Sequence, residues 1–172
     1  MPSRQRIDRA KRKAHDYERD YSGCAQSVLG AIQEEFNIGN KESFKAASAL
    51  AGGIARRGET CGAIIGALSA LGLARGRERI EDTETYKAAM EPSMQLCAKF
   101  MEELKRQLGF DGELKNTLCA NIQEVLYGRS FDLTTEEGYQ AFLEAGGHSD
   151  TGCPRVCGIA AQVVAKEISR IA

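Results

Sequence analysis

Tryptophan is absent from this 172-residue chain, and proline, histidine and aromatic residues are scarce. With three prolines and two histidines, the sequence has few helix breakers and little of the imidazole chemistry on which serine-type or histidine-based hydrolases depend. Runs of β-branched residues are also few, whereas the stronger helix formers Ala, Leu, Glu, Lys and Arg are plentiful. The composition therefore predicts an all-α protein, and it identifies no set of catalytic residues.

A strong net charge and a long apolar run are also missing. The formal net charge of −1 argues against a general nucleic-acid binder, which needs a large positive field to attract phosphates. No stretch near the first residue resembles a signal peptide, and the longest uncharged run, residues 60–74, is shorter than the about 20 residues that a membrane-spanning helix needs. We therefore expect a cytoplasmic protein with no membrane insertion and no nucleic-acid partner.

The apolar residues recur at helical spacing along the whole chain, and no repeat, linker or second domain is visible. The pattern predicts helices over residues 4–21, 22–36, 40–58, 61–73, 83–108, 114–127 and 154–171, and a short helix around Tyr139, Phe142 and Leu143 within the segment 131–147. The first of these belongs to a basic outer helix within residues 1–20, and Pro92 is expected to kink or split the longest one. The predicted architecture is a single domain, residues 1–172, folded as an irregular bundle of six to eight helices.

The helix expected over residues 61–73 has almost no polar side chain on any face, which is typical of a central buried helix. Gly58, Gly62 and Gly66 recur every four residues along it, so its backbone can approach a neighbour closely. Two interpretations remain open for Gly62 and Gly66: they bind a bulky cofactor, or they allow tight packing against another helix.

The six cysteines are the main chemical feature of the sequence. In a reducing compartment they are metal ligands, redox thiols or small buried residues rather than structural disulfides. Cys24, Cys61 and Cys153 each fall at the start of a predicted helix, and Cys119 is expected in a similar place. Free N–H groups and the helix dipole stabilise a thiolate there. The sequence lacks the compact cysteine motifs of zinc ribbons, bacterial ferredoxins and covalently bound haem.

The order of these motifs resembles the redox-active family named for its C…GCAxxG…C…C pattern. The resemblance rests on Gly-Cys-Ala-Gln at residues 23–26, Gly52-Gly53, Cys-Gly-Ala-Ile-Ile-Gly at residues 61–66, and then Cys119 and Cys153. This chain has Cys-Gly-Ala where the pattern is written Gly-Cys-Ala. The likeness extends roughly from residue 21 to residue 168.

The resemblance implies redox activity and makes Cys24, Cys61, Cys119 and Cys153 the four family positions. A similar cysteine-bearing helical unit occurs in split-Soret cytochromes, which associate an iron–sulfur centre with haem. Because this chain has no haem-attachment motif, only the cluster half of that comparison transfers. Four thiolates are the usual ligands of a [2Fe–2S] or [4Fe–4S] cluster, so these four cysteines are the candidate ligands.

The other two cysteines and one histidine receive weaker assignments. Cys97 lies on a Met-rich helix face and is interpreted as a core residue. Cys157, four residues after Cys153, and His148, in a Gly-rich loop, are possible extra ligands.

The leading interpretation is an electron-transfer or redox-sensing protein with an iron–sulfur cluster and a redox partner protein. Under this interpretation we expect an electron carrier or accessory redox protein rather than a substrate-specific enzyme. A metal-free thiol–disulfide protein with depressed thiol pKa values and a structural zinc protein remain alternatives. We also expect a homodimer, formed through exposed rings among Tyr17, Tyr21, Tyr86 and Phe131.

Overall fold

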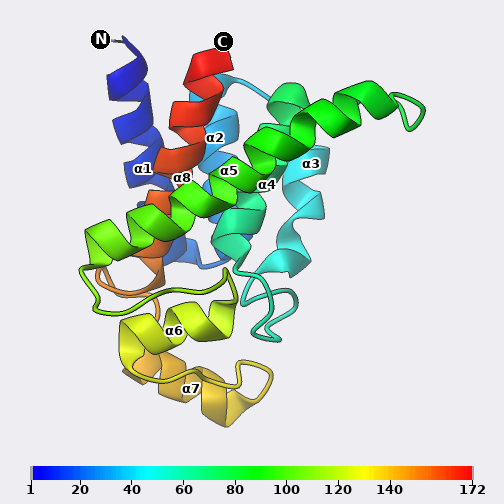
Figure 1. Ribbon diagram of the computed structural model, residues 1–172. Helices are drawn as coiled ribbons and strands as arrows, with labels where there is room; N and C mark the ends of the chain where they lie inside the picture. Colours follow the sequence, from blue (N-terminus) through cyan, green and yellow to red (C-terminus); the bar gives the residue numbers. More distant parts are fainter. Residues whose placement is uncertain (1, 172) are drawn as a thin grey trace.

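The computed structural model describes residues 2–171, and within this range the chain forms eight α-helices, one short 3-10 helix and no β-strand (Figure 1). The elements are α1 (Pro2–Tyr21), α2 (Cys24–Phe36), α3 (Lys41–Ala46), η1 (Ser48–Leu50), α4 (Gly62–Arg75), α5 (Thr83–Leu108), α6 (Cys119–Tyr127), α7 (Glu136–Glu144) and α8 (Cys153–Ile171). The predicted all-α fold and the predicted number of helices are confirmed.

The core is a bundle in which α8 lies between α1, α2 and α4, and α5 crosses over α8 and α4 (Figure 1). Helix α1 can approach α8 and α2 closely because Ala10 and Ala14, both 0% exposed, lie on its inner face. The helix that the sequence predicts as outer and basic therefore has one face in the core. Within the described residues no helix has the length and apolar character needed to cross a bilayer.

Two predicted helices end or begin at other places in the structure. The helix expected over residues 40–58 is capped by Asn40 as predicted, but it ends at Ala46 and is followed by η1 and an irregular loop. The helix expected from residue 114 begins at Cys119. Helix α5 runs through Pro92 as one element, so of the two effects expected of this proline, a kink or a split, the split does not occur.

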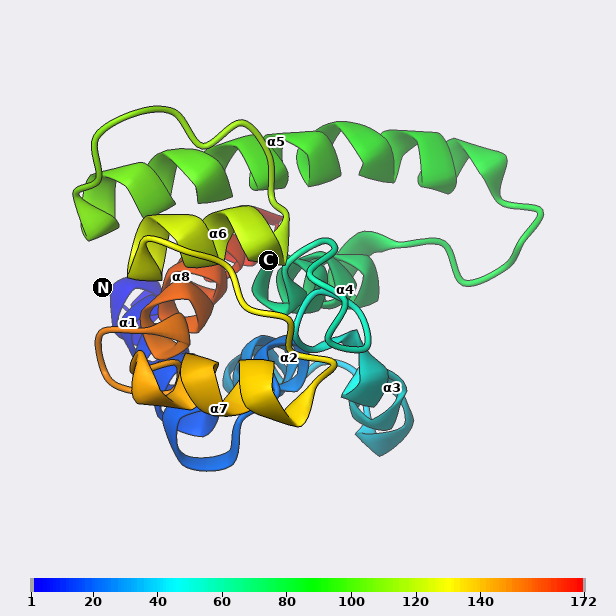
Figure 2. The same ribbon diagram turned by 90° about the horizontal axis from the view of Figure 1, so that it is seen from below.

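A second, smaller group of buried residues closes one end of the bundle. Phe131, Leu133 and Phe142 form it, and α6, α7 and their connecting loops carry it (Figure 2). Phe131 is 9% exposed and packs edge-on against Phe142, so it cannot supply the expected exposed ring. Tyr21 is 78% exposed, and the homodimer stays a prediction.

Candidate functional site

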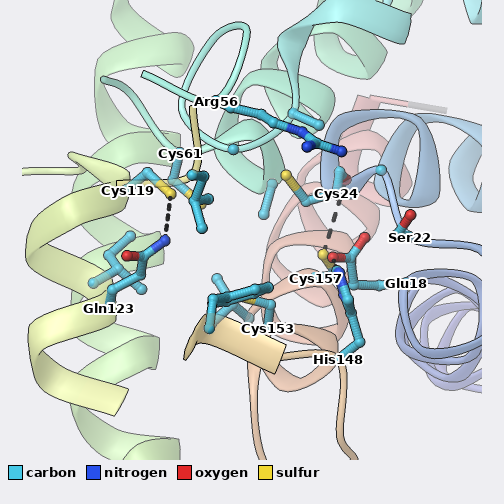
Figure 3. Close-up of a pocket in the computed structure, with 18 of the residues that line it drawn as sticks. Glu18, Ser22, Cys24, Arg56, Cys61, Cys119, Gln123, His148, Cys153 and Cys157 are labelled. Carbon is cyan, nitrogen blue, oxygen red and sulfur yellow. Dashed lines mark hydrogen bonds and ion pairs between the residues drawn. The ribbon is translucent and has the colours of Figure 1, made fainter. Parts of the chain in front are cut away.

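A cavity of about 80 Å³ lies between the helical core and the small cluster of α6 and α7 (Figure 3). Its walls carry thiols from distant parts of the chain: Cys24, Cys61, Cys119, Cys153 and Cys157. The volume is several times what a single water needs, so the cavity can hold a group of several atoms. Cys97, interpreted from the sequence as a core residue, is half-buried on α5 and does not line the cavity.

Four helices begin at this cavity, which is why the cysteines meet there. Helices α2, α6 and α8 start at Cys24, Cys119 and Cys153, and Cys61 is the residue immediately before α4. The sequence therefore predicts correctly that these cysteines lie at helix starts. All four helix starts lie at the end of the bundle that α6 and α7 cover (Figures 1 and 2).

Cys61 and Cys119 are held together by their backbones. The Cys61 N–H donates to the Thr117 carbonyl at 2.8 Å, and the Cys119 N–H donates to the Glu59 carbonyl at 2.7 Å. Between them, Thr60 and Leu118 form an isolated antiparallel bridge. The spacing of the two backbones that carry these thiols is therefore set by main-chain hydrogen bonds.

Gln123 positions the Cys119 thiol from one turn further along α6. Its side-chain nitrogen donates to Cys119 Sγ at 3.5 Å, and its side-chain oxygen accepts from the Phe131 N–H at 2.9 Å. Gln123 is 2% exposed, so both ends of its amide are used inside the protein. The amide links the sulfur to the small aromatic cluster.

Tyr127 has a similar role at Cys153. Its hydroxyl accepts a hydrogen bond from the Cys153 N–H at 3.1 Å, and it can donate to Cys153 Sγ at 3.5 Å or to the Gly147 carbonyl at 3.2 Å. The first helical N–H of α8 is therefore shared between a side chain of α6 and the Gly147 carbonyl, which accepts from it at 3.0 Å.

The expected glycine stripe of α4 faces helix α2. A Cβ on Gly66 would collide with the Ala25 carbonyl oxygen, and one on Gly62 would collide with Cys24 Sγ. No cofactor can lie against the helix at these positions, because α2 already occupies the space. Of the two interpretations left open by the sequence, the structure supports tight helix packing. The missing side chain of Gly62 also leaves the space that Cys24 Sγ occupies.

Burial controls the acidity of the thiols. Removal from water raises the pKa of Cys61 to about 11 and that of Cys153 to about 12, and it raises the pKa of Cys24 and Cys119 as well. The backbone N–H groups of Ala63 and Ile64, at the start of α4, lower the pKa of Cys61, as expected for a helix terminus, but by less than burial raises it. The expectation of depressed thiol pKa values is therefore wrong for the metal-free chain.

A buried acid and a histidine form one wall of the cavity. Glu18 is 3% exposed, accepts a hydrogen bond from the Ser27 hydroxyl at 3.3 Å, and lies with Oε1 3.2 Å from Nδ1 of His148. The Nδ1 atom is buried without hydrogen-bond geometry to any acceptor in the described residues. His148 thus lines the cavity together with Cys157, but its nearest polar neighbour is a carboxylate.

The loop after η1 follows an unusual backbone path past the cavity. Five consecutive residues, Gly52 to Arg56, have φ between 51° and 70°, and three of them are not glycine. Left-handed backbone costs about 1–2 kcal/mol for each residue that carries a Cβ. A Cβ on Gly53 would lie 2.7 Å from that of Cys119, so the turn passes directly against the cysteine site. It places Arg56 in the cavity wall.

The donor set fits an iron–sulfur group, which takes four cysteine thiolates. In residues 2–171, no three His, Cys, Asp or Glu side chains are grouped so that they could hold one metal ion as they stand. A tetrahedral zinc site needs four ligands at about 2.0–2.3 Å from one ion. A cluster differs because its thiolates bind separate iron atoms around a core of several atoms, for which the cavity leaves room.

Fold and site together define an all-helical protein with a buried cavity lined by thiols. The chain belongs to the family described as "Putative redox-active protein (C_GCAxxG_C_C)", whose model matches residues 22–167. The resemblance seen in the sequence is thereby confirmed, and redox activity is what the family's description names. No curated protein and no solved structure matches the chain.

Proposed function

We propose that the protein holds an iron–sulfur cluster in the cavity through Cys24, Cys61, Cys119 and Cys153 and exchanges electrons with a redox partner protein. One observation carries this proposal: the four family cysteines, from four different helix starts, line one buried cavity. A cluster would supply one-electron chemistry there.

The surrounding residues suit such a group. Amide and hydroxyl donors reach two of the proposed ligands, Gln123 at Cys119 and Tyr127 at Cys153. Hydrogen bonds to ligand sulfurs raise the potential of a cluster because they stabilise its more negative reduced state. Phe142 and Leu133, both buried, give the same cavity an apolar wall. The chain's own part is thus to hold, orient and shield the redox group.

The alternatives are less well supported. A metal-free thiol–disulfide protein needs a thiolate near neutral pH, whereas burial raises the pKa values of the cavity thiols. A structural zinc site needs four ligands around one ion, and within residues 2–171 no three candidate ligand side chains are grouped so that they could hold one. A cluster with cysteine ligands also suits a reducing compartment, so the cytoplasm is part of the proposal.

Anaerobic purification with iron, sulfide and zinc analysis tests the proposal. We expect about two irons per chain for a [2Fe–2S] cluster or about four for a [4Fe–4S] cluster, with an equal amount of acid-labile sulfide. We also expect broad visible absorption that decreases on reduction. Stoichiometric zinc without colour would establish the structural alternative instead. A colourless, metal-free protein with a reversible disulfide would establish the thiol–disulfide alternative.

A further inference from the structure

Arg56 is a side chain of the cavity wall that neither the family pattern nor the proposed cluster accounts for. Among the residues that line the cavity it carries the one permanent positive charge, and the acid there, Glu18, already faces His148. Arg56 is exposed at the surface and also lines the cavity, so it lies where the cavity meets solvent. Figure 3 shows its side chain extending along one edge of the cavity towards Cys24.

The guanidinium is held by contacts that leave its donor groups available. Its carbon lies 4.5 Å from the centre of the Tyr139 ring, so the cation stacks on the face of an aromatic side chain. Stacking fixes the plane of an arginine and leaves the N–H edges free to bind a carboxylate or a similar oxyanion in two places. Within the part of the chain that the structure describes, the guanidinium has no hydrogen bond or ion pair of its own.

The backbone under Arg56 is specialised for this placement. The residue has φ 65° in the left-handed turn, and its N–H is fixed by the Ala51 carbonyl at 3.1 Å. Strained backbone of this kind persists where the surrounding structure holds it, and it concentrates at functional sites. The neighbouring Arg57 differs, because it lies 3.9 Å from Glu59 and does not line the cavity.

We propose that Arg56 makes the mouth of the cavity selective for small anions, and that the site receives a small carboxylate or oxyanion beside the cysteines. The proposal deepens the proposed function, since that anion would be the species that meets the redox group. It does not require a particular metal, because the charge, the stacking and the cavity all belong to the chain itself.

Two alkylating reagents of similar size test the selectivity. Iodoacetate is a carboxylate and iodoacetamide is neutral, and each reacts with a thiolate as the sulfur–carbon bond forms and iodide leaves. The full-length protein in its free-thiol form is treated with either reagent, and peptide mass analysis gives the rate at each cysteine. The ratio of the two rates cancels the acidity of the thiol. Cys97, which lies outside the cavity, is the internal reference.

We expect the iodoacetate-to-iodoacetamide ratio at Cys24 and Cys153 to exceed that at Cys97, and Arg56→Gln to lower it by about tenfold at low salt. Arg57→Gln is the matched control and should leave the ratio unchanged. Raising the ionic strength should reduce the preference. A wild-type ratio no higher than that of Cys97, or equal losses in both arginine variants, would overturn the proposal.

The outcome is separable from that of the proposed function. Absence of iron and sulfide in the purified protein would end the cluster assignment without changing the reagent ratio. An unchanged ratio in Arg56→Gln would end the anion proposal whatever the metal content. Because Arg56 is exposed, its replacement should fold, and the helical circular-dichroism signal verifies that.

Discussion

The hydroxyl oxygen of Tyr127 lies 3.1 Å from the backbone nitrogen of Cys153 and 3.5 Å from its sulfur. One side chain of α6 thus shares the first N–H of α8 with the Gly147 carbonyl and contacts a proposed ligand. Burial raises the pKa of Cys153, and the hydrogen bond from Tyr127 opposes that rise. The Tyr127 hydroxyl therefore affects both the stability of the fold and the acidity of the Cys153 thiol.

Tyr127→Phe should therefore have two effects. It leaves the Cys153 N–H with the Gly147 carbonyl as its remaining acceptor, and the lost hydrogen bond should lower the free energy of unfolding by about 1 kcal/mol in urea titrations. It also removes a donor from the sulfur, so the midpoint potential of the cluster should become more negative. Tyr139→Phe is the control, because the Tyr139 hydroxyl has no hydrogen bond within the described residues. Equal changes in both variants would contradict this prediction.

The two cysteines of α8 should differ in function. Cys153 begins the helix at the cavity, whereas Cys157 is 0% exposed and its thiol lies 3.9 Å from the Cys24 carbonyl, an acceptor within the core. Cys153→Ser should lose the iron and the visible absorption, and Cys157→Ser should keep both. Iron and sulfide analysis of the two purified variants measures this. The reverse pattern would exchange the roles of the two residues.

Cys61 and Cys97 form a second matched pair. Cys61→Ser should abolish cluster binding, because backbone hydrogen bonds fix Cys61 next to Cys119 and the substitution removes a thiolate from that position. Cys97→Ala should bind a full cluster and lose about 1 kcal/mol of stability from a small cavity. Full iron content in Cys61→Ser would show that this residue is not a ligand.

Helix α4 offers a test of the packing at Gly66. Gly66→Ala should destabilise the protein by about 1–3 kcal/mol, since the added methyl meets the Ala25 carbonyl oxygen and α2 must move. Gly72→Ala, in the same helix, has open space at its Cβ and should be neutral or stabilise by up to about 1 kcal/mol. Thermal unfolding of both variants measures the contrast. If Gly72→Ala were destabilised as much as Gly66→Ala, the loss of stability could not be assigned to the contact between Gly66 and the Ala25 carbonyl.

The metal-free protein should lose stability in alkali. The pKa of Cys61 is about 11 and that of Cys153 about 12 in the folded chain, against about 8.5 for an unfolded cysteine. The unfolded state therefore releases these protons first as the pH rises. The stabilising contribution is complete below about pH 8.5 and then falls by about 1.4 kcal/mol per pH unit for each such thiol until its folded pKa is reached.

Urea titrations of the reduced, metal-free protein between pH 8 and pH 10.5 measure this slope. The Cys61→Ser variant is the control, and its slope should be shallower because one of the titrating thiols is gone. Stability that does not fall across this range would contradict the burial of the thiols in the folded chain.

Much of the fold follows from local sequence signals. Cap-type residues or a proline beside them place Cys24, Cys61 and Cys153 at helix starts, and Asn40 is a cap by its residue type. Such signals involve residues close in the chain. The start of the helix near residue 114 was wrong because periodicity fixes a helix better than it fixes its ends.

The rest of the site depends on contacts between distant segments. Glu18 lies one turn after Ala14 on the buried face of α1, but only the folded chain shows that His148 meets it. The left-handed path through Ile54 and Arg56 has no local signal, since neither residue type favours it. Gln123 and Tyr127 look like ordinary helical residues until the sulfur atoms beside them are known.

The bridge between Thr60 and Leu118 also has a consequence for the order of events in folding. It joins segments on either side of α4 and α5, so closing it carries the loop entropy of that whole stretch of chain. Contacts of such long sequence separation form after local helices have formed. Because Cys61 and Cys119 are next to this bridge, the complete cysteine site exists only once α4 and α5 have docked, and the proposed cluster would bind to a chain that is already folded.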